Sequence, residues 1–297
     1  MSHGLLRAAG IRGPTAQRPD VFQRQPDEES MSATDSDQVG VLRHEKKGHV
    51  GVVTFDNPSK FNAVNYDMWC ALPRVMAEFA ADPEIRVVML TGAGNKAFVS
   101  GADISQFKDR REGDAADAYN QATAAGYASV LNCPKPTVAK IRGICMGGGL
   151  GIALNCDIRI CSDDVRFRMP AARLGLGYAF EGIQRFVDVM GMANTADLFF
   201  SARIFGGADA LQMGLVKQVV PVQDFDAEVD AYVRTIGENA PLTLAAAKRC
   251  LLELSKNPDQ RDVERARAMI LACFASNDYK EGREAFAQKR TPQFTGR

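Results

Sequence analysis

The order of strand-like and helix-like runs is the feature that most constrains how this chain folds. Residues 49–56, 85–92, 137–143 and 157–162 are apolar runs typical of strands, and residues 65–81 and 113–131 carry helical patterns. After residue 181 we expect helices over 181–201, 207–213, 225–238, 241–255 and 260–289. Strands that alternate with helices and are followed by a helical end predict an α/β core with a helical C-terminal region.

The first 37 residues differ in composition from the rest of the chain. Few of them are large and apolar, so we expect a disordered extension over 1–37, followed by an α/β core over 38–225 and a helical region over 226–297. Residues 1–30 weakly resemble a transit peptide, because they carry Arg and no acidic residue before Asp20. The alternative interpretation is an extension upstream of a start at Met31.

Composition excludes several classes of function. The chain has 36 basic and 36 acidic residues, so no overall field favours nucleic acid or an anionic membrane surface. No window approaches the roughly 18 apolar residues that a membrane span needs. The seven cysteines are scattered without a CxxC pair, which indicates reduced thiols. We therefore expect a cytoplasmic protein, or one of the mitochondrial matrix if residues 1–30 are a transit peptide.

Few side chains are suited to metal or nucleophilic chemistry. The three histidines are His3, His44 and His49, and there is no HExxH, Cys/His cluster or GxSxG motif. We therefore expect no metal and no Ser–His catalytic pair. The GGGLG run at 147–151 lacks the GxGxxG spacing of a dinucleotide loop, so we expect no nucleotide cofactor.

Two glycine-bearing stretches, residues 95–107 and 143–157, each join a strand to the start of a helix. Backbone N–H groups at helix N-termini are unpaired and favour negative charge. If two such amides converge, they form an oxyanion hole that glycines allow a carbonyl oxygen to approach. Close packing of helix on strand is the alternative for either stretch alone. No titratable side chain lies between Met146 and Asn155, and the first acid to follow is Asp157.

Four motifs, in this order, resemble the crotonase superfamily, the enoyl-CoA hydratase/isomerase family: AFVSGADISQF, IRGICMGGGLGIALNCDIRICSDDVRF, GLVKQVV and DYKEGREAFAQKRTPQF. The resemblance runs from about residue 40 to the C-terminus. It implies a crotonase-like spiral of ββα units, a C-terminal helical trimerisation region, a homotrimer or dimer of trimers, and an acyl-CoA substrate with no separate cofactor. By position, the family's two oxyanion amides fall on Ala102 and Gly148.

The chain departs from the hydratase pattern at its acid–base groups. The positions of the two hydratase glutamates hold Gly151 and Ala171, which cannot transfer a proton. The acid of the isomerases falls on Ala179, two residues before Glu181. Glu181 is either a displaced catalytic acid or a carboxylate that complements a helix N-terminus.

Tyr178 lies in GLGYAFEGI, which resembles the methylmalonyl-CoA decarboxylase branch, where a tyrosine occupies this position. Its hydroxyl would orient a substrate carboxylate or a water. The alternative is a half-buried aromatic residue with its hydroxyl at the rim. Asp103 is interpreted as a first-turn helix residue rather than a base.

Contacts to coenzyme A are also implied by the resemblance. The backbone around Asn62 and Ala63 matches the segment that holds the pantetheine and adenine. Phe286 and Lys289 match residues that reach the coenzyme A of a neighbouring subunit, and a lysine charge suits phosphate. A solvated helix face is the alternative for Lys289.

These patterns together predict an acyl-CoA-transforming enzyme with enoyl-CoA hydratase/isomerase-type chemistry. Two alternatives stay open. One is a decarboxylase of a malonyl-type acyl-CoA, and the other is a catalytically silent acyl-CoA-binding protein that lacks both hydratase glutamates.

Overall fold

The computed structural model describes residues 39–103, 105 and 114–297. The extension expected over 1–37, with its candidate transit peptide, lies outside the described residues. Val39–Arg297 form one compact unit.

Two sheets form the core of this unit. The larger has the strand order β1-β2-β3-β5-β7-β9 and the smaller has the order β4-β6-β8. Only the β1–β2 pair is antiparallel among these pairings, and the remaining neighbours are parallel. The strands are β1 (Val41–Lys47), β2 (Val50–Asp56), β3 (Val87–Gly92), β4 (Ala97–Val99), β5 (Thr137–Ile141), β6 (Ile144–Met146), β7 (Ile158–Ser162), β8 (Arg166–Arg168) and β9 (Gln218–Val220). From β3 onward, successive strands alternate between the two sheets, so the chain advances as a spiral.

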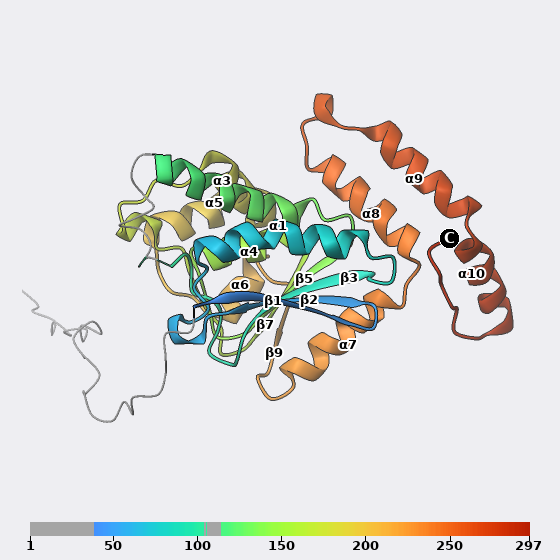
Figure 1. Ribbon diagram of the computed structural model, residues 1–297, viewed down its shortest axis with the longest axis horizontal. Coiled ribbons are helices and arrows are strands. Elements are labelled where there is room, and N and C mark those ends of the chain that lie inside the picture. Colours follow the sequence, from blue (N-terminus) through green and yellow to red (C-terminus); the bar gives the residue numbers. More distant parts are fainter. Residues whose placement is uncertain (1–38, 104, 106–113) are drawn as a thin grey trace, which may run out of the picture. The chain divides into compact units, whose positions relative to one another are not determined.

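Helices cover both faces of the larger sheet. The α-helices are α1 (Tyr66–Ala81), α3 (Asp114–Leu131), α4 (Gly148–Asn155), α5 (Phe180–Ser201), α6 (Gly207–Gln212), α7 (Phe225–Gly237), α8 (Pro241–Leu254), α9 (Val263–Ala275) and α10 (Asn277–Gln288), and the 3-10 turns are η1 (Pro58–Lys60), η3 (Ala171–Arg173) and η4 (Pro258–Gln260). In Figure 1, α1, α3 and α4 lie on one side of the larger sheet and α7 on the other. The expected α/β class and helical C-terminal region are confirmed.

The helix expected over 65–81 shows how the sequence specifies these elements. Asn65 precedes α1, and its side-chain oxygen accepts a hydrogen bond from the Met68 N–H at 2.8 Å, which caps the helix. Met68, Trp69 and Leu72 then recur at the helical period on its buried face.

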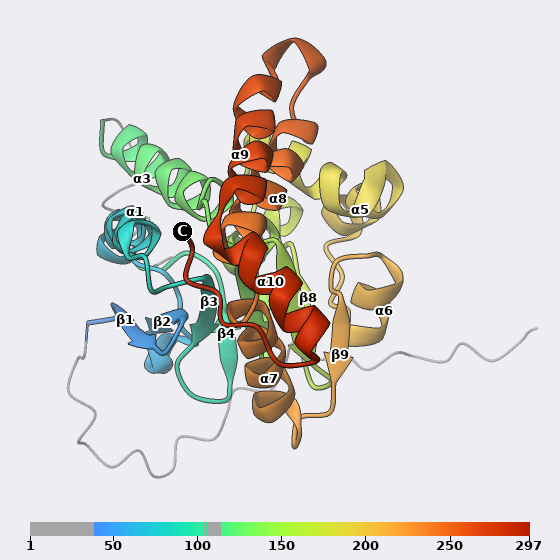
Figure 2. The same ribbon diagram turned by 90° about the vertical axis from the view of Figure 1, so that its right-hand side faces the viewer.

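The prediction of one helix over 260–289 is wrong. The chain leaves the helical conformation at Ser276, where φ is −78° and ψ is 158°, so that α9 and α10 are separate helices. The Ser276 hydroxyl accepts a hydrogen bond from the Tyr279 N–H at 3.1 Å, which makes it the N-cap of α10. After α10 the chain turns back beside that helix (Figure 2), and buried Asp278 accepts hydrogen bonds from the Thr295 N–H at 2.6 Å and the Gly296 N–H at 2.8 Å.

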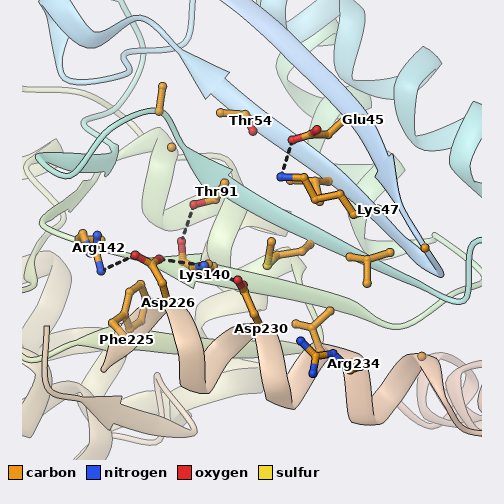
Figure 3. A pocket seen from close by; sticks show the side chains of 18 of the residues that line it. Glu45, Lys47, Thr54, Thr91, Lys140, Arg142, Phe225, Asp226, Asp230 and Arg234 are labelled. Atoms are coloured by element: carbon orange, nitrogen blue, oxygen red, sulfur yellow. Dashed lines mark hydrogen bonds and ion pairs between the residues drawn. The ribbon is translucent and has the colours of Figure 1, made fainter. Parts of the chain in front are cut away.

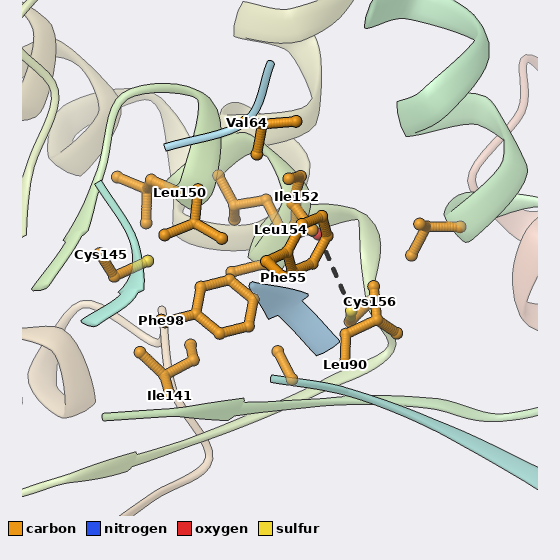
Figure 4. Close-up of a cluster of buried hydrophobic side chains, with 14 of the residues drawn as sticks. Phe55, Val64, Leu90, Phe98, Ile141, Cys145, Leu150, Ile152, Leu154 and Cys156 are labelled. Atoms are coloured by element: carbon orange, nitrogen blue, oxygen red, sulfur yellow. Dashed lines mark hydrogen bonds between the residues drawn. The ribbon is translucent and has the colours of Figure 1, made fainter. Parts of the chain in front are cut away.

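The main apolar core fills the space between the two sheets and the helices above them. In Figure 4, Leu150 and Ile152 of α4 pack beside Phe55 of β2 and Phe98 of β4, whose rings meet edge to face with centroids 6.1 Å apart. Cys156 lies in this cluster, and burial raises the pKa of its thiol to about 12, so it stays protonated. All seven cysteines are free thiols.

An ion pair ties α8 to the core. The Lys248 ammonium, with a side chain only 3% exposed, lies 2.6 Å from a carboxylate oxygen of Asp157. The same oxygen accepts a hydrogen bond from the Thr137 N–H at 2.8 Å, at the start of β5. Asp157, the first acid after the glycine run, is therefore engaged in holding the fold together. Across the described part of the chain, no helix combines the length and the apolarity that crossing a membrane would take.

Candidate active site

The two glycine-bearing stretches meet at one edge of the smaller sheet. Ala102 follows β4 and Gly148 follows β6, and these strands are parallel neighbours, so their carboxyl ends lie together. A Cβ atom placed on Gly148 would lie 3.3 Å from the Ala102 backbone nitrogen. A Cβ atom placed on Gly101 would lie 3.9 Å from the Gly148 nitrogen. The two backbone amides named from the sequence are therefore adjacent.

The glycines around these amides are present for different reasons. Gly101, with φ of +132°, and Gly147, with φ of +49°, adopt backbone conformations that residues with a side chain rarely adopt, and each directly precedes one of the amides. A Cβ atom on Gly149 would instead lie 2.2 Å from the Val99 carbonyl oxygen. Gly149 thus allows close packing of α4 on β4, and Gly147 allows the chain to turn just before the amide of Gly148, whose role in an oxyanion hole stays a prediction.

The backbone hydrogen bonds around Ala102 are made by the residues beside it. Ala102 forms a parallel bridge with Val64, in which the hydrogen bonds are made by its neighbours: Val64 donates to the Gly101 carbonyl at 2.9 Å, and Asp103 donates to the Val64 carbonyl at 2.9 Å. Gly148 is the first residue of α4, whose leading N–H groups have no partner within the helix. In the part of the chain that the structure describes, neither N–H donates to a backbone acceptor.

Two arginine side chains donate hydrogen bonds to backbone carbonyl groups at the C-terminal end of α4. The Arg159 side chain, buried at 9% exposure, donates to the carbonyls of Cys156 and Leu215, and the Arg185 side chain donates to the Leu154 carbonyl at 2.9 Å. Burial lowers the pKa of Arg159 to about 10, which still leaves it charged at neutral pH. Positive charge at a helix C-terminus stabilises the helix dipole, whose positive end lies at Gly148.

Tyr127 is a site residue that the sequence analysis missed. It projects from α3, and its hydroxyl donates a hydrogen bond to the Gly148 carbonyl oxygen at 3.2 Å. Its ring meets the Trp69 ring edge to face, with centroids 5.2 Å apart. A Cβ atom on Gly151 would lie 2.6 Å from the Tyr127 hydroxyl oxygen, so this hydroxyl occupies the space that a side chain at 151 would need. The sequence around Tyr127 gives only a weak indication of its place in the site. Gly126 precedes it and allows α3 to approach Trp69, because a Cβ atom on Gly126 would lie 2.8 Å from Cε3 of Trp69.

Tyr178 lies beside Tyr127. Its ring packs against Phe186 and Phe199, with centroids 5.9 Å and 5.2 Å away, and its hydroxyl forms a hydrogen bond with the hydroxyl of Tyr127. A Cβ atom on Gly182 would lie 2.5 Å from the Tyr178 ring, so a glycine is needed there. Burial raises the pKa of the Tyr178 hydroxyl, although the bond to Tyr127 acts in the opposite direction. The aromatic packing considered for Tyr178 is therefore present, and the orientation of a substrate carboxylate or a water by its hydroxyl stays a prediction.

The carboxylates near these residues lie in different settings. Glu181 is exposed in the first turn of α5, which begins one residue earlier, and its role stays a prediction. Asp103 follows Ala102 and is buried, and its carboxylate lies 2.8 Å from the Lys60 ammonium. Burial alone would raise the pKa of Asp103, but hydrogen bonds from Lys60 and Ser105 outweigh it and hold the pKa below its usual value. Ala171 is buried in the apolar core.

The residues named for coenzyme A lie in two places. Asn62 is buried, has a φ of +58°, and donates from its side chain to the carbonyls of Ala93 at 2.9 Å and Ala97 at 2.8 Å, so it fixes the loop after β2 against β4. Ala63 is also buried beside it. Phe286, which is 87% exposed, and Lys289 lie at the end of α10, outside the group of residues gathered around Gly148. Their contacts to coenzyme A stay predictions.

The described residues hold no candidate metal cluster. No cluster of three or more His, Cys, Asp or Glu side chains that could hold a metal ion occurs among those residues. The Nδ1–H group of His49 donates a hydrogen bond to the Glu84 carbonyl oxygen, 2.8 Å away, and His44 lies 3.3 Å from the Glu78 carboxylate.

A cavity of about 670 Å³ lies between the larger sheet and α7 (Figure 3), and neither Ala102 nor Gly148 lines it. In this cavity the Lys140 ammonium lies 2.9 Å from the Asp226 carboxylate and 2.8 Å from the Asp230 carboxylate. The Arg142 guanidinium lies 3.1 Å from the Asp226 carboxylate. The charges are mutually compensated, and no residue named from the sequence as a site residue lines this cavity.

Comparisons with known proteins identify the family of this chain. The family model for enoyl-CoA hydratase/isomerase matches residues 45–297. The chain is 34% identical over 252 residues to the short-chain-enoyl-CoA hydratase of Clostridium acetobutylicum, which covers 83% of this chain and 94% of that protein. It is 33% identical over 253 residues to a probable enoyl-CoA hydratase of Mycobacterium bovis, which covers 85% and 97%. The crystal structure of an enoyl-CoA hydratase/carnithine racemase from Magnetospirillum magneticum matches with a TM-score of 0.81 and 33% identity, and covers 86% and 96%.

The described chain therefore has the crotonase fold, an α/β spiral with a helical C-terminal end. It belongs to the enoyl-CoA hydratase/isomerase family.

Proposed function

We propose that the protein is an acyl-CoA-transforming enzyme in which the backbone amides of Ala102 and Gly148 bind the thioester oxygen and stabilise the enolate that forms from it. The observation that carries this proposal is the distance of 3.3 Å between the Ala102 nitrogen and the position of a Cβ atom on Gly148, because the proposed donors must lie close together to bind one oxygen. The named hydratases among the relatives support the acyl-CoA substrate.

The chemistry follows from where charge develops. Hydration, isomerisation and decarboxylation of an acyl-CoA all place negative charge on the thioester oxygen in the transition state. Fixed N–H donors require no reorganisation when that charge appears, and each is worth roughly 10²–10³ in rate. The dipole of α4 adds to the donor at Gly148.

Which reaction follows depends on the groups around the oxyanion hole. Enoyl-CoA hydratase/isomerase-type chemistry is the general class that the family supports. Decarboxylation of a malonyl-type acyl-CoA is the second candidate, because the positions of the two hydratase glutamates hold Gly151 and Ala171 while Tyr178 lies beside the hole. A protein that binds acyl-CoA without converting it is the third.

A panel of acyl-CoA thioesters tests the proposal. The purified protein is incubated with enoyl, 3-hydroxyacyl and malonyl-type thioesters, and the products are identified by mass spectrometry. We expect conversion of at least one class. Tight binding of an acyl-CoA without turnover of any would instead support the silent binding protein.

The C-terminal helices are the proposed site of assembly into a homotrimer or a dimer of trimers. Large apolar side chains are exposed on them: Leu251, Leu254, Leu271, Phe274 and Phe286. Burial of such side chains against another copy would supply the hydrophobic driving force for association. Light scattering on the eluting protein measures the assembly, and a monomer would contradict this part of the proposal together with the inter-subunit role of Phe286 and Lys289.

We further propose a cytoplasmic location, on the basis of the free thiols. The alternative is the mitochondrial matrix, directed by residues 1–30. Localisation of a fluorescent fusion with and without those residues distinguishes the two.

A further inference from the structure

The glycine run 147–149 needs support from outside itself. Its three residues carry no side chain that could fix the backbone, and Gly147 has a φ of +49°. An oxyanion hole works only when its N–H donors are fixed before the reaction begins, because reorientation during the reaction would cost the energy that the donors supply. The orientation of the Gly148 amide must therefore be set by contacts with other parts of the chain.

Backbone hydrogen bonds fix the first residue of this run. The Gly147 N–H donates to the Arg168 carbonyl at 3.0 Å, and the Gly147 carbonyl accepts a hydrogen bond from the Gly151 N–H at 3.1 Å. The next residue is reached by a side chain. The Tyr127 hydroxyl donates a hydrogen bond to the Gly148 carbonyl oxygen at 3.2 Å, so a residue of α3 contacts the backbone that carries one of the two proposed oxyanion amides.

Two glycines leave the space in which the Tyr127 side chain lies. A Cβ atom on Gly151 would lie 2.6 Å from the Tyr127 hydroxyl oxygen, and a Cβ atom on Gly126 would lie 2.8 Å from Cε3 of Trp69. The Tyr127 ring meets the Trp69 ring edge to face, with centroids 5.2 Å apart. The ring is thus packed against α1, and its hydroxyl is held at the first turn of α4.

Trp69 supports Gly148 from a second direction. Its side chain is buried, and its Cζ2 lies 3.5 Å from the position of a Cβ atom on Gly148. Two aromatic side chains from different helices therefore lie against this one residue. They act differently, because packing limits where Gly148 can move, whereas the bond from Tyr127 is directional and restricts the rotation of its peptide group.

We propose that Tyr127 is a positioning residue of the oxyanion hole, whose hydroxyl holds the Gly148 carbonyl and so fixes the direction in which the Gly148 N–H points. This inference rests on the proposed function of Ala102 and Gly148 as donors to the thioester oxygen. Tyr127 acts through Gly148 and contacts neither the substrate nor a reacting atom.

A positioning role predicts a particular kinetic effect. The bond from an N–H donor to the thioester oxygen strengthens as negative charge develops, so a misdirected donor costs more in the transition state than in the bound ground state. Removal of the Tyr127 hydroxyl should therefore lower kcat and kcat/KM by the same factor and leave KM unchanged. We expect a decrease of about 10–100-fold, because a misplacement of about 1 Å costs roughly 10²-fold. A purely structural role would lower the melting temperature and leave the rate of the folded protein unchanged.

Two variants disturb this contact from opposite sides, and their rates are measured on the best substrate of the thioester panel. Tyr127→Phe keeps the ring and removes the hydroxyl. Gly151→Ala keeps the hydroxyl and displaces it, because the new Cβ atom would lie 2.6 Å from its oxygen. We expect both to lower kcat at unchanged KM, and the double variant to be no slower than the slower single variant. The control is Thr123→Val, which removes from the same helix a hydroxyl that donates to the Tyr119 carbonyl at 2.9 Å, and it should keep the wild-type kcat.

The carbonyl stretching frequency of a bound thioester reports on the donors without turnover. The probe is acetyl-CoA labelled with ¹³C at its carbonyl, which has no double bond to hydrate and no carboxylate to lose, and the method is isotope-edited infrared difference spectroscopy. In the wild-type protein, hydrogen bonds from the two amides should lower the frequency relative to free acetyl-CoA. Tyr127→Phe should show a smaller lowering and a broader band, while Thr123→Val should match the wild type.

The outcomes separate this inference from the function on which it rests. A folded Tyr127→Phe protein with the wild-type kcat and the wild-type carbonyl frequency would overturn the positioning role alone, and so would losses that multiply in the double variant. If the wild-type protein does not lower the frequency of the bound carbonyl, and the Gly148 substitution described below leaves turnover unchanged, the proposed function itself fails.

Discussion

Gly148→Ala tests the oxyanion hole with a single added methyl group. The new Cβ atom would lie 3.3 Å from the Ala102 nitrogen, 3.5 Å from Cζ2 of Trp69 and 3.6 Å from the Gly101 carbonyl carbon. Shifts of a few tenths of an ångström relieve these contacts, so we expect a loss of about 1 kcal/mol in the free energy of unfolding, at the low end for overpacking.

The same methyl group removes the space for the substrate oxygen. An oxyanion must lie roughly 2.7–3.1 Å from its donors. A methyl carbon 3.3 Å from the Ala102 nitrogen occupies that place, so neither amide can be reached. With each donor worth about 10²–10³ in rate, the loss of both predicts a decrease in kcat/KM of about 10⁴–10⁶-fold.

Two neighbouring glycines provide controls for this experiment. A Cβ atom on Gly177 meets no atom within 4 Å, so Gly177→Ala should keep both stability and activity. Gly149→Ala would place a Cβ atom 2.2 Å from the Val99 carbonyl oxygen and should lower the melting temperature markedly. Initial rates on the best acyl-CoA and thermal unfolding curves are measured for all three variants. A folded Gly148→Ala protein with kcat/KM near that of the wild type would refute the assignment of the two amides.

The remaining predictions concern the reaction and the fold. Hydration of crotonyl-CoA should be far slower than in a two-glutamate hydratase, because each missing acid–base group is worth about 10²–10⁴-fold; a kcat in the ordinary hydratase range contradicts this. With methylmalonyl-CoA as substrate, Tyr178→Phe should lower kcat, whereas Glu181→Gln should leave kcat nearly unchanged and cost only about 0.3–1 kcal/mol in stability. If Glu181→Gln instead has the larger effect on kcat, measured with an enoyl-CoA, Glu181 transfers the proton. Lys248→Met leaves the Asp157 carboxylate without its cation and should cost about 3–5 kcal/mol in urea unfolding, while an unchanged midpoint would show that the pair contributes nothing net.

The local part of the site could be predicted from the sequence. The stretches 95–107 and 143–157 stood out because glycines between a strand and a helix leave backbone N–H groups bare, which is a property of the chain within a few residues, and the resemblance to the family then placed the two amides at Ala102 and Gly148. In the structure these two amides lie close together, and their role as an oxyanion hole stays a prediction. The main strands and helices could also be predicted from short stretches of sequence, because their apolar residues recur over at least five positions.

The rest depended on packing between distant segments. Tyr127 lies 24 residues before Gly151 in a helix with few large apolar residues, and only the approach of α3 to α4 makes it part of the site. Strands β4, β6 and β8 have three residues each, too few to show a period of two. Strand β1 was also missed, since it is an edge strand whose side chains are mostly exposed. The apolar pattern alone predicted one helix here, but the Ser276 hydroxyl caps the start of α10 and so separates α10 from α9.

Trp69 gives the protein a built-in spectroscopic reporter. It is the single tryptophan of the chain, its side chain is 1% exposed, and its Cζ2 lies 3.5 Å from the position of a Cβ atom on Gly148. Its indole N–H has no hydrogen-bond acceptor among the residues that the structure describes. Intrinsic fluorescence of the unlabelled protein therefore arises from one buried ring beside the two amides, and its emission should shift when a thioester oxygen arrives there. Stopped-flow fluorescence can then time the binding step separately from the chemistry.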